Sequence, residues 1–153
     1  MEIRGASIED IEEIKNLFRE TVISVNSKDY NNEQISIWAD FSNDSDLWNK
    51  RIVDEYFFVS EENNKILGFC SMTESGNLDM LYVHKDFQGK GVASVLMNEL
   101  FENSNFLGIN KIVSEVSISA KTFFIKHGFK EIKENQSDLK GMSFKNYIMA
   151  KEL

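Results

Sequence analysis

The feature that most constrains this chain is a glycine-rich turn placed between two apolar runs. Residues 78–83 read "LDMLYV", residues 84–91 read "HKDFQGKG", and residues 92–101 read "VASVLMNELF". An apolar β-rich run, a turn with two glycines and a helix-like run predict a strand, a tight connection and a helix. The turn contains no acid after Asp86, although the chain has a net charge of -8. The turn therefore either holds an anion or only connects a strand to a helix.

The elements around this turn predict an α+β fold. Strands are expected over 1–6, over the two arms of a hairpin at 56–72, and over 78–83, 111–117, 129–134 and 143–153. Helices are expected over 7–24, 32–39, 45–53, 91–103 and 120–127. A meander followed by a strand–helix–strand crossover gives a mixed sheet with helices packed on it. We expect 78–83 and 111–117 to run parallel, within a single domain over residues 1–153.

Composition and charge exclude some classes of protein. With 153 residues, of which 42% are hydrophobic and 27% charged, the chain fits an ordinary soluble domain with a full core. No run reaches the roughly 18 apolar residues of a membrane span, so no membrane partner is expected. The net charge of -8 argues against a nucleic-acid partner, because such a partner requires a basic surface.

A cytoplasmic location is expected from the cysteine count and the first residues. Cys70 is the only cysteine, so no internal disulfide can form. The opening "MEIRGASIEDIEEIK" is acidic and periodic, unlike a secretion signal. One cysteine and two histidines, far apart in the sequence, lack the spacing of a metal site. We therefore expect no metal.

Two nucleotide-binding motifs compete for the glycine turn. A glycine turn that opens a helix exposes free N–H groups, and the helix dipole adds positive potential that suits a phosphate. A P-loop would need lysine after its second glycine, but here Lys90 precedes Gly91. A Rossmann turn would need a third glycine where this chain has Ser94, and it would follow its strand directly. The five residues "HKDFQ" and the position after a meander argue against a Rossmann turn.

A third motif fits the turn better. The run Gln88-Gly89-Lys90-Gly91-Val92-Ala93 matches the pattern Q/R-x-x-G-x-G/A after a strand ending in valine. The later run "FFIKHGF" matches the pattern F/Y-x-K-x-G-F. Together these motifs resemble the GNAT N-acetyltransferases, and the resemblance extends in order over the whole chain. The segments "VNSKDYNNEQISIWA" and "MSFKNYIMAKEL" resemble a subgroup of small, functionally unassigned bacterial members. The resemblance implies the GNAT acyl-CoA N-acyltransferase fold, a mostly antiparallel sheet with one splayed parallel strand pair.

The resemblance also implies a cofactor and a reaction. In this family acetyl-CoA lies in the gap between the splayed strands, with its pyrophosphate on the amides of the glycine turn. Carried onto this chain, the cofactor-binding residues are Leu81, Tyr82, Val83, Gln88, Gly89, Lys90, Gly91, Val92, Ala93, Ser94, Ser117, Phe124 and Lys126. The implied reaction is direct attack of a primary amine, on a small molecule, peptide or protein, on the thioester. Another acyl-CoA, or a non-catalytic CoA-binding or interaction domain, stays an alternative, and a homodimer stays open.

Proton transfer is where the chain departs from the family pattern. Many members carry a tyrosine at the position of Phe124, and its hydroxyl protonates the departing thiolate. Phenylalanine cannot do this. The substitute catalytic candidates are Asp79, Tyr82, Glu115 and Tyr147. The tyrosines offer a hydroxyl as acid, and the carboxylates offer a base that acts through a water. Each of these side chains also fits an ordinary structural role.

The resemblance places the acceptor site between the first helices and the last strands. The aromatic candidates there are Trp38, Phe41, Trp48, Phe144 and Tyr147, of which Trp38, Trp48 and Tyr147 are the expected substrate-binding residues. Asp40, Asp44 and Asp46 lie in the same segment, and with the negative net charge they favour a cationic amine. For any single one of these aromatic side chains, core packing is the better explanation.

Overall fold

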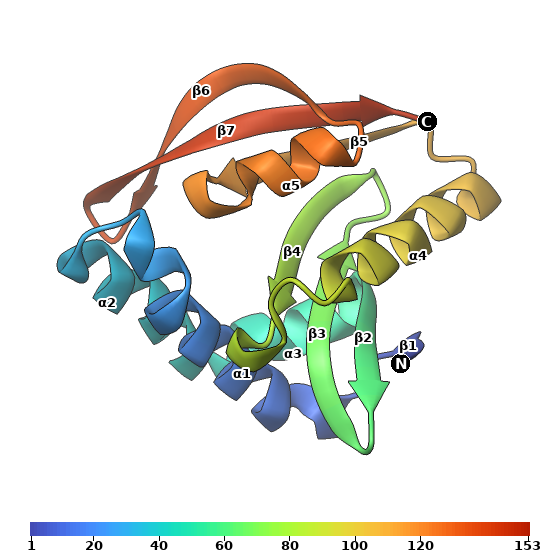
Figure 1. Ribbon diagram of the computed structural model, residues 1–153, viewed down its shortest axis with the longest axis horizontal. Helices are drawn as coiled ribbons and strands as arrows, with labels where there is room; N and C mark the ends of the chain where they lie inside the picture. The colour runs from blue at the N-terminus through green and yellow to red at the C-terminus, as the bar shows by residue number, and fades with distance from the viewer.

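The computed structural model describes residues 1–153 and contains a seven-stranded sheet in the order β1-β2-β3-β4-β5-β7-β6 (Figure 1). The strands are β1 (Glu2–Gly5), β2 (Tyr56–Glu62), β3 (Lys65–Met72), β4 (Asn77–Val83), β5 (Lys111–Ser117), β6 (Lys130–Leu139) and β7 (Met142–Glu152). The α-helices are α1 (Ile11–Ser24), α2 (Asn32–Asp40), α3 (Ser45–Asp54), α4 (Val92–Leu107) and α5 (Lys121–Lys126). None of these helices is long and apolar enough to cross a membrane.

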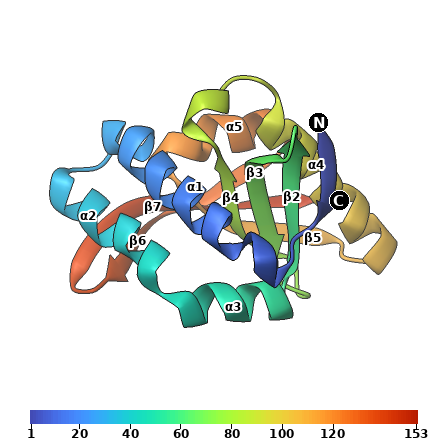
Figure 2. The ribbon, with the colours of Figure 1, turned by 90° about the horizontal axis from the view of Figure 1, so that it is seen from below.

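Helices cover both faces of the sheet. On one face α1, α2 and α3 pack against β2–β4 through a cluster that includes Phe18 and Trp48. On the other face α4 and α5 pack through a second cluster that includes Leu100 and Phe124. Figure 2 shows α1 and α3 in front of the central strands, with α4 and α5 behind them. This arrangement confirms the predicted α+β fold.

The one parallel pair of the sheet, β4 with β5, opens almost at once. The two strands are paired only at Asn77 with Val113 and at Leu78 with Ser114. The Ser114 hydroxyl donates a 2.8 Å hydrogen bond to the Leu78 carbonyl, which closes the narrow end of the gap. Beyond this point the strands diverge and their facing edges are unpaired. The parallel pair and its splay are therefore as the sequence and the resemblance predicted.

The C-terminal hairpin is longer than predicted. The sequence suggested a strand over 129–134, whereas β6 continues to Leu139 and turns at Lys140 (φ 51°) and Gly141 (φ 81°). The polar run "ENQSDLKG" lacks hydrophobic alternation, because much of this strand pairs at the edge of the sheet and is exposed. The helix predicted over 91–103 is also longer: it continues to Leu107 and is capped by Gly108 (φ 74°).

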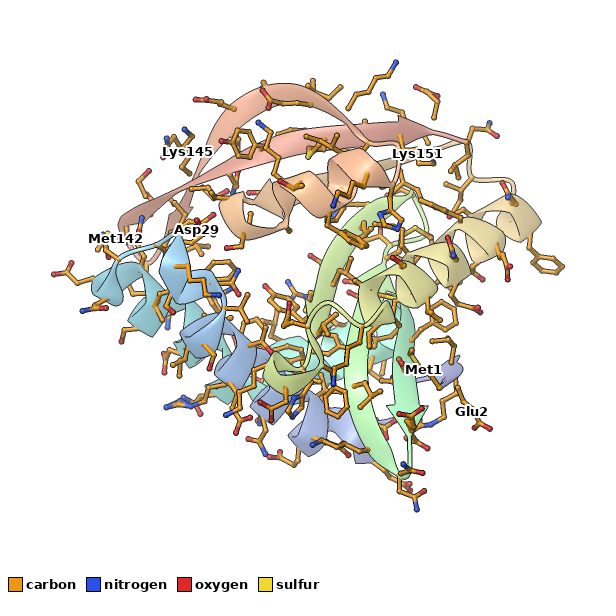
Figure 3. All side chains as sticks on the ribbon, viewed as in Figure 1. Met1, Glu2, Asp29, Met142, Lys145 and Lys151 are labelled. Carbon is orange, nitrogen blue, oxygen red and sulfur yellow. The ribbon has the colours of Figure 1, made fainter.

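The hairpin packs against the connection between α1 and α2. The Tyr30 hydroxyl donates to the Lys145 carbonyl at 2.7 Å and accepts from the Ile118 N–H at 3.0 Å. Figure 3 shows Asp29 on the same side of the molecule as Met142 and Lys145. Tyr30 thus joins the segment between α1 and α2 to β7 and to the residue that follows β5, at the wide end of the gap.

Candidate active site

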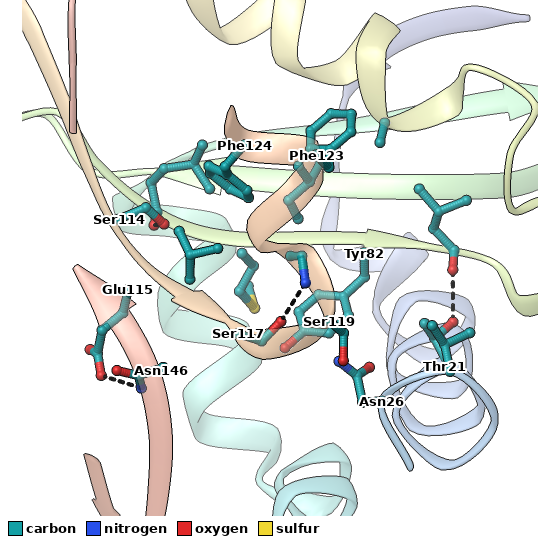
Figure 4. A pocket seen from close by; sticks show the side chains of 18 of the residues that line it. Thr21, Asn26, Tyr82, Ser114, Glu115, Ser117, Ser119, Phe123, Phe124 and Asn146 are labelled. Atoms are coloured by element: carbon teal, nitrogen blue, oxygen red, sulfur yellow. Dashed lines mark hydrogen bonds between the residues drawn. The ribbon is translucent and has the colours of Figure 1, made fainter. Parts of the chain in front are cut away.

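A cavity of about 630 Å³ occupies the gap between β4 and β5. It extends from the glycine turn and the first turn of α4, past α5, to the α1–α2 segment and the β6–β7 hairpin. Figure 4 shows how Tyr82 of β4, Glu115 of β5 and Asn146 of β7 lie around it. The cavity joins segments from the whole length of the chain, so the splay of the two strands creates the site.

The edge of β4 that faces the gap presents free backbone groups. The His84 N–H donates to the Leu67 carbonyl at 2.8 Å, and the antiparallel register pairs Tyr82 with Phe69 and Leu81 with Cys70. Because antiparallel partners alternate in the direction of their hydrogen bonds, His84 and Tyr82 bond to β3, while Leu81 and Val83 face away from it. The backbone groups of Leu81 and Val83 can therefore reach a cofactor in the gap, as predicted.

The Val83 carbonyl is already engaged within the protein. It accepts from the Thr21 hydroxyl at 2.9 Å, drawn in Figure 4, and from the Gln88 side-chain amide at 2.8 Å. A carbonyl oxygen has two lone pairs, so both are used. The groups left free on this edge are the N–H of Val83 and the N–H and carbonyl of Leu81. The Gln88 side chain, expected at a phosphate, reaches back to β4 instead.

The glycine turn has the backbone shape of an anion site. Gly89 (φ 71°) and Gly91 (φ 84°) both adopt the left-handed conformation that favours glycine. Gly91 caps α4, whose first turn contains no acid, and the first helical amides there have no partner within the helix. Nothing lies within 4 Å of where a Cβ would stand at either glycine. The turn therefore leaves open space in front of unpaired N–H groups.

Two basic side chains line the end of the cavity at α4. These are Lys126 and His127 of the α5 C-terminus. His127 Nε2 lies 3.1 Å from Ser94 Oγ, and Nδ1 lies 3.0 Å from the Phe123 carbonyl. Lys90, which was expected in the phosphate cradle, does not line the cavity. Its Nζ lies 5.2 Å from the centre of the Phe87 ring.

The carboxylates in the cavity lining lie on the two splayed strands. Glu115 Oε1 accepts from Asn146 Nδ2 at 3.1 Å, from Asn135 Nδ2 at 3.4 Å and from the Ser137 hydroxyl. Glu115 thus has neutral partners and no cation. Asn146 and Ser137 were not predicted as site residues, because they reach Glu115 only through the full-length hairpin. The strand register could have identified them, because side chains on the same face of adjacent strands lie next to each other.

Asp79 has a different environment. The register passes from Ser71–Met80 to Met72–Leu78, so Asp79 is the extra residue of a β-bulge. Arg51 Nε of α3 lies 2.9 Å from Asp79 Oδ2. Burial first, and then the hydrogen bond and charge of Asp79, raise the pKa of Glu55 to about 7. Sequence alone gave no sign of Glu55, which sits at the end of α3.

Tyr82 presents a hydroxyl inside the cavity. Its Oη accepts a hydrogen bond from Trp38 Nε1 at 3.2 Å, so its own proton is free to be donated. Burial raises the pKa of Tyr82, which keeps the hydroxyl neutral. Trp38 itself lines the cavity, as expected of a substrate-binding residue. The two side chains join α2 to β4 beside the gap.

The other predicted residues divide between the cavity and the core. Phe124 lines the cavity and presents an apolar ring there, with no hydroxyl. Ser117 also lines the cavity, and its Oγ accepts a hydrogen bond from the Ala120 N–H. Tyr147 does not line it, since its ring packs under α5 with Lys121 Nζ 3.9 Å from the ring centre. Trp48 does not line it either.

Trp48 is a core residue. Only 1% of its surface is exposed, its ring packs on Phe18 and Phe69, and its Nε1 donates to the Phe41 carbonyl at 2.9 Å. Trp48 therefore has no surface to offer to an acceptor. Asp40, one of the acids expected near the acceptor, lies outside the cavity and pairs with Lys140 at 2.9 Å.

Comparisons with known proteins agree with the motifs. The family model for the acetyltransferase (GNAT) domain matches residues 26–151. The chain is 30% identical over 149 residues to the uncharacterized N-acetyltransferase YafP of Escherichia coli strain K12, covering 97% of this chain and 94% of that protein.

Solved structures share the fold over almost the full length. A GCN5-related N-acetyltransferase from Rhodopseudomonas palustris matches with a TM-score of 0.96 and 26% identity, covering 99% of this chain and 95% of that one. The PaiA N-acetyltransferase from Thermoplasma acidophilum, solved in complex with coenzyme A, matches with a TM-score of 0.83 and 24% identity, covering 99% and 98%. The domain match and the Escherichia coli relative show that this chain belongs to the GNAT acetyltransferase family.

Proposed function

We propose that the protein transfers the acetyl group of acetyl-CoA to a primary amine by direct attack of the amine on the thioester. The observation that carries the proposal is the cavity, which joins the free edge of β4, an acid-free glycine turn and a carboxylate-lined end. The coenzyme A complex of the Thermoplasma acidophilum structure supports the choice of cofactor.

The residues of the cavity fit the two ends of this cofactor. The unpaired amides between Gly89 and Ser94, with Lys126 and His127 beside them, suit the negative charge of a pyrophosphate. The free N–H and carbonyl of Leu81 suit the amides of the pantetheine arm. Acetyl-CoA supplies an activated thioester, whose carbonyl oxygen gains charge during attack, and we assign the free Val83 N–H as the donor to it.

Proton removal from the amine falls to the carboxylate end of the cavity. A lysine-like amine has an ordinary pKa near 10.4, so it must lose a proton before it attacks. Glu115 and Asp79 flank the point where the strands diverge, and we assign them as proton acceptors that act through water. Glu115, whose partners are all neutral, favours a cationic acceptor, either a small amine or a peptide or protein amino group.

Proton supply to the departing thiolate falls to Tyr82. An ordinary thiol has a pKa near 8.5, so its thiolate leaves readily, and a hydrogen bond from a neutral hydroxyl is enough to stabilise the departing sulfur. Phe124 has no hydroxyl, and Tyr147 lies outside the cavity. The Tyr82 hydroxyl, oriented by Trp38, has a free proton inside the cavity.

Release of free thiol from acetyl-CoA, measured across a panel of amines, tests the proposal. Turnover with at least one amine is expected, and it should fall strongly in the Glu115→Gln variant. Tight binding of coenzyme A without turnover for any amine would favour a non-catalytic CoA-binding domain. Faster turnover with a longer acyl-CoA would favour a different acyl donor, and failure to bind coenzyme A would overturn the proposal altogether.

A further inference from the structure

His127 joins two parts of the cavity that are far apart in the sequence. It follows the last residue of α5, and both of its ring nitrogens have partners: the Phe123 carbonyl at 3.0 Å and Ser94 Oγ at 3.1 Å. The imidazole also lies against the Phe123 ring, with 4.1 Å between ring centres. These three contacts fix the orientation of the ring toward the first turn of α4.

The partners decide which nitrogen carries the proton. A carbonyl oxygen can only accept, so Nδ1 must carry the proton that it donates to Phe123. In the neutral ring Nε2 is then an acceptor, and the Ser94 hydroxyl must donate to it. The single proton of Ser94 therefore points at His127, away from the open space in front of the glycine turn.

An anion at the start of α4 would reverse the direction of the hydrogen bond between Ser94 and His127, because it would attract the Ser94 proton. We propose that His127 takes up a proton when the nucleotide end of the cofactor binds, so that Nε2–H donates to Ser94 Oγ and the Ser94 hydroxyl donates to the pyrophosphate. His127 is thus a positioning residue that acts through Ser94. This inference rests on the proposed cofactor site and adds to it a linkage between binding and protonation.

The charged groups near His127 favour uptake, rather than release, of a proton when the anion binds. Lys126 precedes it on α5, and Lys151 Nζ of β7 lies against Gly128 on its other side. Lys121 of α5 is paired with Glu131, and the first turn of α4 contributes no acid. The charged side chains next to the ring in sequence and across Gly128 are thus cations, with no carboxylate among them. The two negative charges of a pyrophosphate offset these cations and favour the protonated ring.

The experiment measures the affinity for dephospho-CoA between about pH 5.5 and 8.5, the range in which an ordinary histidine titrates. Dephospho-CoA keeps the pyrophosphate but lacks the 3′-phosphate, whose second ionisation near pH 6 would confuse the result. We expect the affinity to fall as the pH rises, by up to about tenfold per unit, because one proton is bound with the ligand. Acetyl-pantetheine, which has no pyrophosphate, should bind with no such slope.

Matched variants separate positioning from a structural role. The His127→Gln variant retains an amide near the Nε2 position but cannot titrate, so its slope should vanish. The Ser94→Ala variant removes the relay and should flatten the slope as well. The chain has two histidines, and the side chain of the other, His84, contacts only Asp86 and Phe87 of its own turn, so His84→Asn should keep the slope.

The outcomes are distinct. Tight binding of dephospho-CoA with a slope that survives in His127→Gln, or an equal slope for acetyl-pantetheine, overturns the role of His127 and leaves the cofactor site intact. No binding of dephospho-CoA at any pH overturns the cofactor site and this inference together.

Discussion

The glycine turn offers a prediction in which stability and binding move in opposite directions. Gly91 caps α4 at φ 84°, and no acid stands in the first turn of that helix. We compare Gly91→Glu with Gly91→Gln, which have nearly the same shape and differ by one charge. Both side chains project into open space, because nothing lies within 4 Å of the Cβ position.

Both variants should lose stability without ligand, because an L-residue in the left-handed conformation costs about 1–2 kcal/mol. The Gly91→Glu variant should lose less than Gly91→Gln, since a negative charge at a helix N-terminus gains about 0.3–1 kcal/mol. For coenzyme A the order reverses. One pair of unit charges about 4 Å apart costs about 1 kcal/mol in water, so the two pyrophosphate charges cost about 2 kcal/mol, or roughly 30-fold in affinity.

Urea unfolding without ligand and calorimetric titration with coenzyme A measure the two effects. The affinity gap between the variants should shrink at high salt, because the turn is exposed and its charges are screened. Equal affinities for the two variants would refute the phosphate role of the turn. An equal loss toward acetyl-pantetheine would refute it too, since that ligand carries no pyrophosphate.

Three further predictions concern packing, protonation and the acid. Gly68→Ala should destabilise by about 1–3 kcal/mol in urea unfolding, because a Cβ there would lie 2.8 Å from Val92 Cγ1 and press on the start of α4. The raised pKa of Glu55 means that the folded state holds this proton more tightly, so its contribution to stability is lost as the pH rises from about 4.5 to about 7. Glu55→Gln should therefore gain about 1 kcal/mol relative to the parent over that window, after discounting for solvent screening. Phe124→Tyr should change turnover only a few-fold, because the proposed donor is elsewhere.

Each of these three predictions has a control or a contrary result. Gly5→Ala is the partner for Gly68→Ala, because nothing lies within 4 Å of its Cβ position, and it should stay within about 0.5 kcal/mol of the parent. A stability difference between Glu55→Gln and the parent that is independent of pH would show that Glu55 does not titrate as inferred. A gain near 100-fold in Phe124→Tyr, the low end for a positioned acid, would place the acid at 124 after all.

Local patterns were enough to predict the parts of the fold that position the cofactor end. The apolar run of β4, the glycine turn and the start of α4 are contiguous, so one window of sequence contained the whole unit. The parallel pairing with β5 followed from the crossover rule. The splay itself was expected only from the family resemblance, since nothing in the residues of β5 marks the loss of pairing beyond Ser114.

The acceptor end depends on long-range packing, and there the sequence was a weaker guide. Trp38 and Trp48 lie in similar amphipathic stretches, yet one lines the cavity and the other fills the core. The difference arises from how α2 and α3 pack on the sheet. Tyr147 likewise lies on the face of β7 that α5 covers, whereas its neighbour Asn146 lies on the face that reaches Glu115. Strand alternation told these two apart only once the register was known.

The position of the proposed proton donor links the two halves of the cavity. Tyr82 belongs to β4, between the two residues whose backbones face the cofactor edge, but its hydroxyl is oriented by Trp38 of α2. A tyrosine at 124 would instead stand on α5, on the opposite face of the sheet from α2. A hydroxyl on β4 is therefore oriented by a residue of the acceptor side, Trp38, whereas a hydroxyl on α5 would be held by the cofactor side. An acceptor that shifts α2 would then change both its own binding and the orientation of the acid, so substrate selection in this chain would act on turnover as well as on affinity.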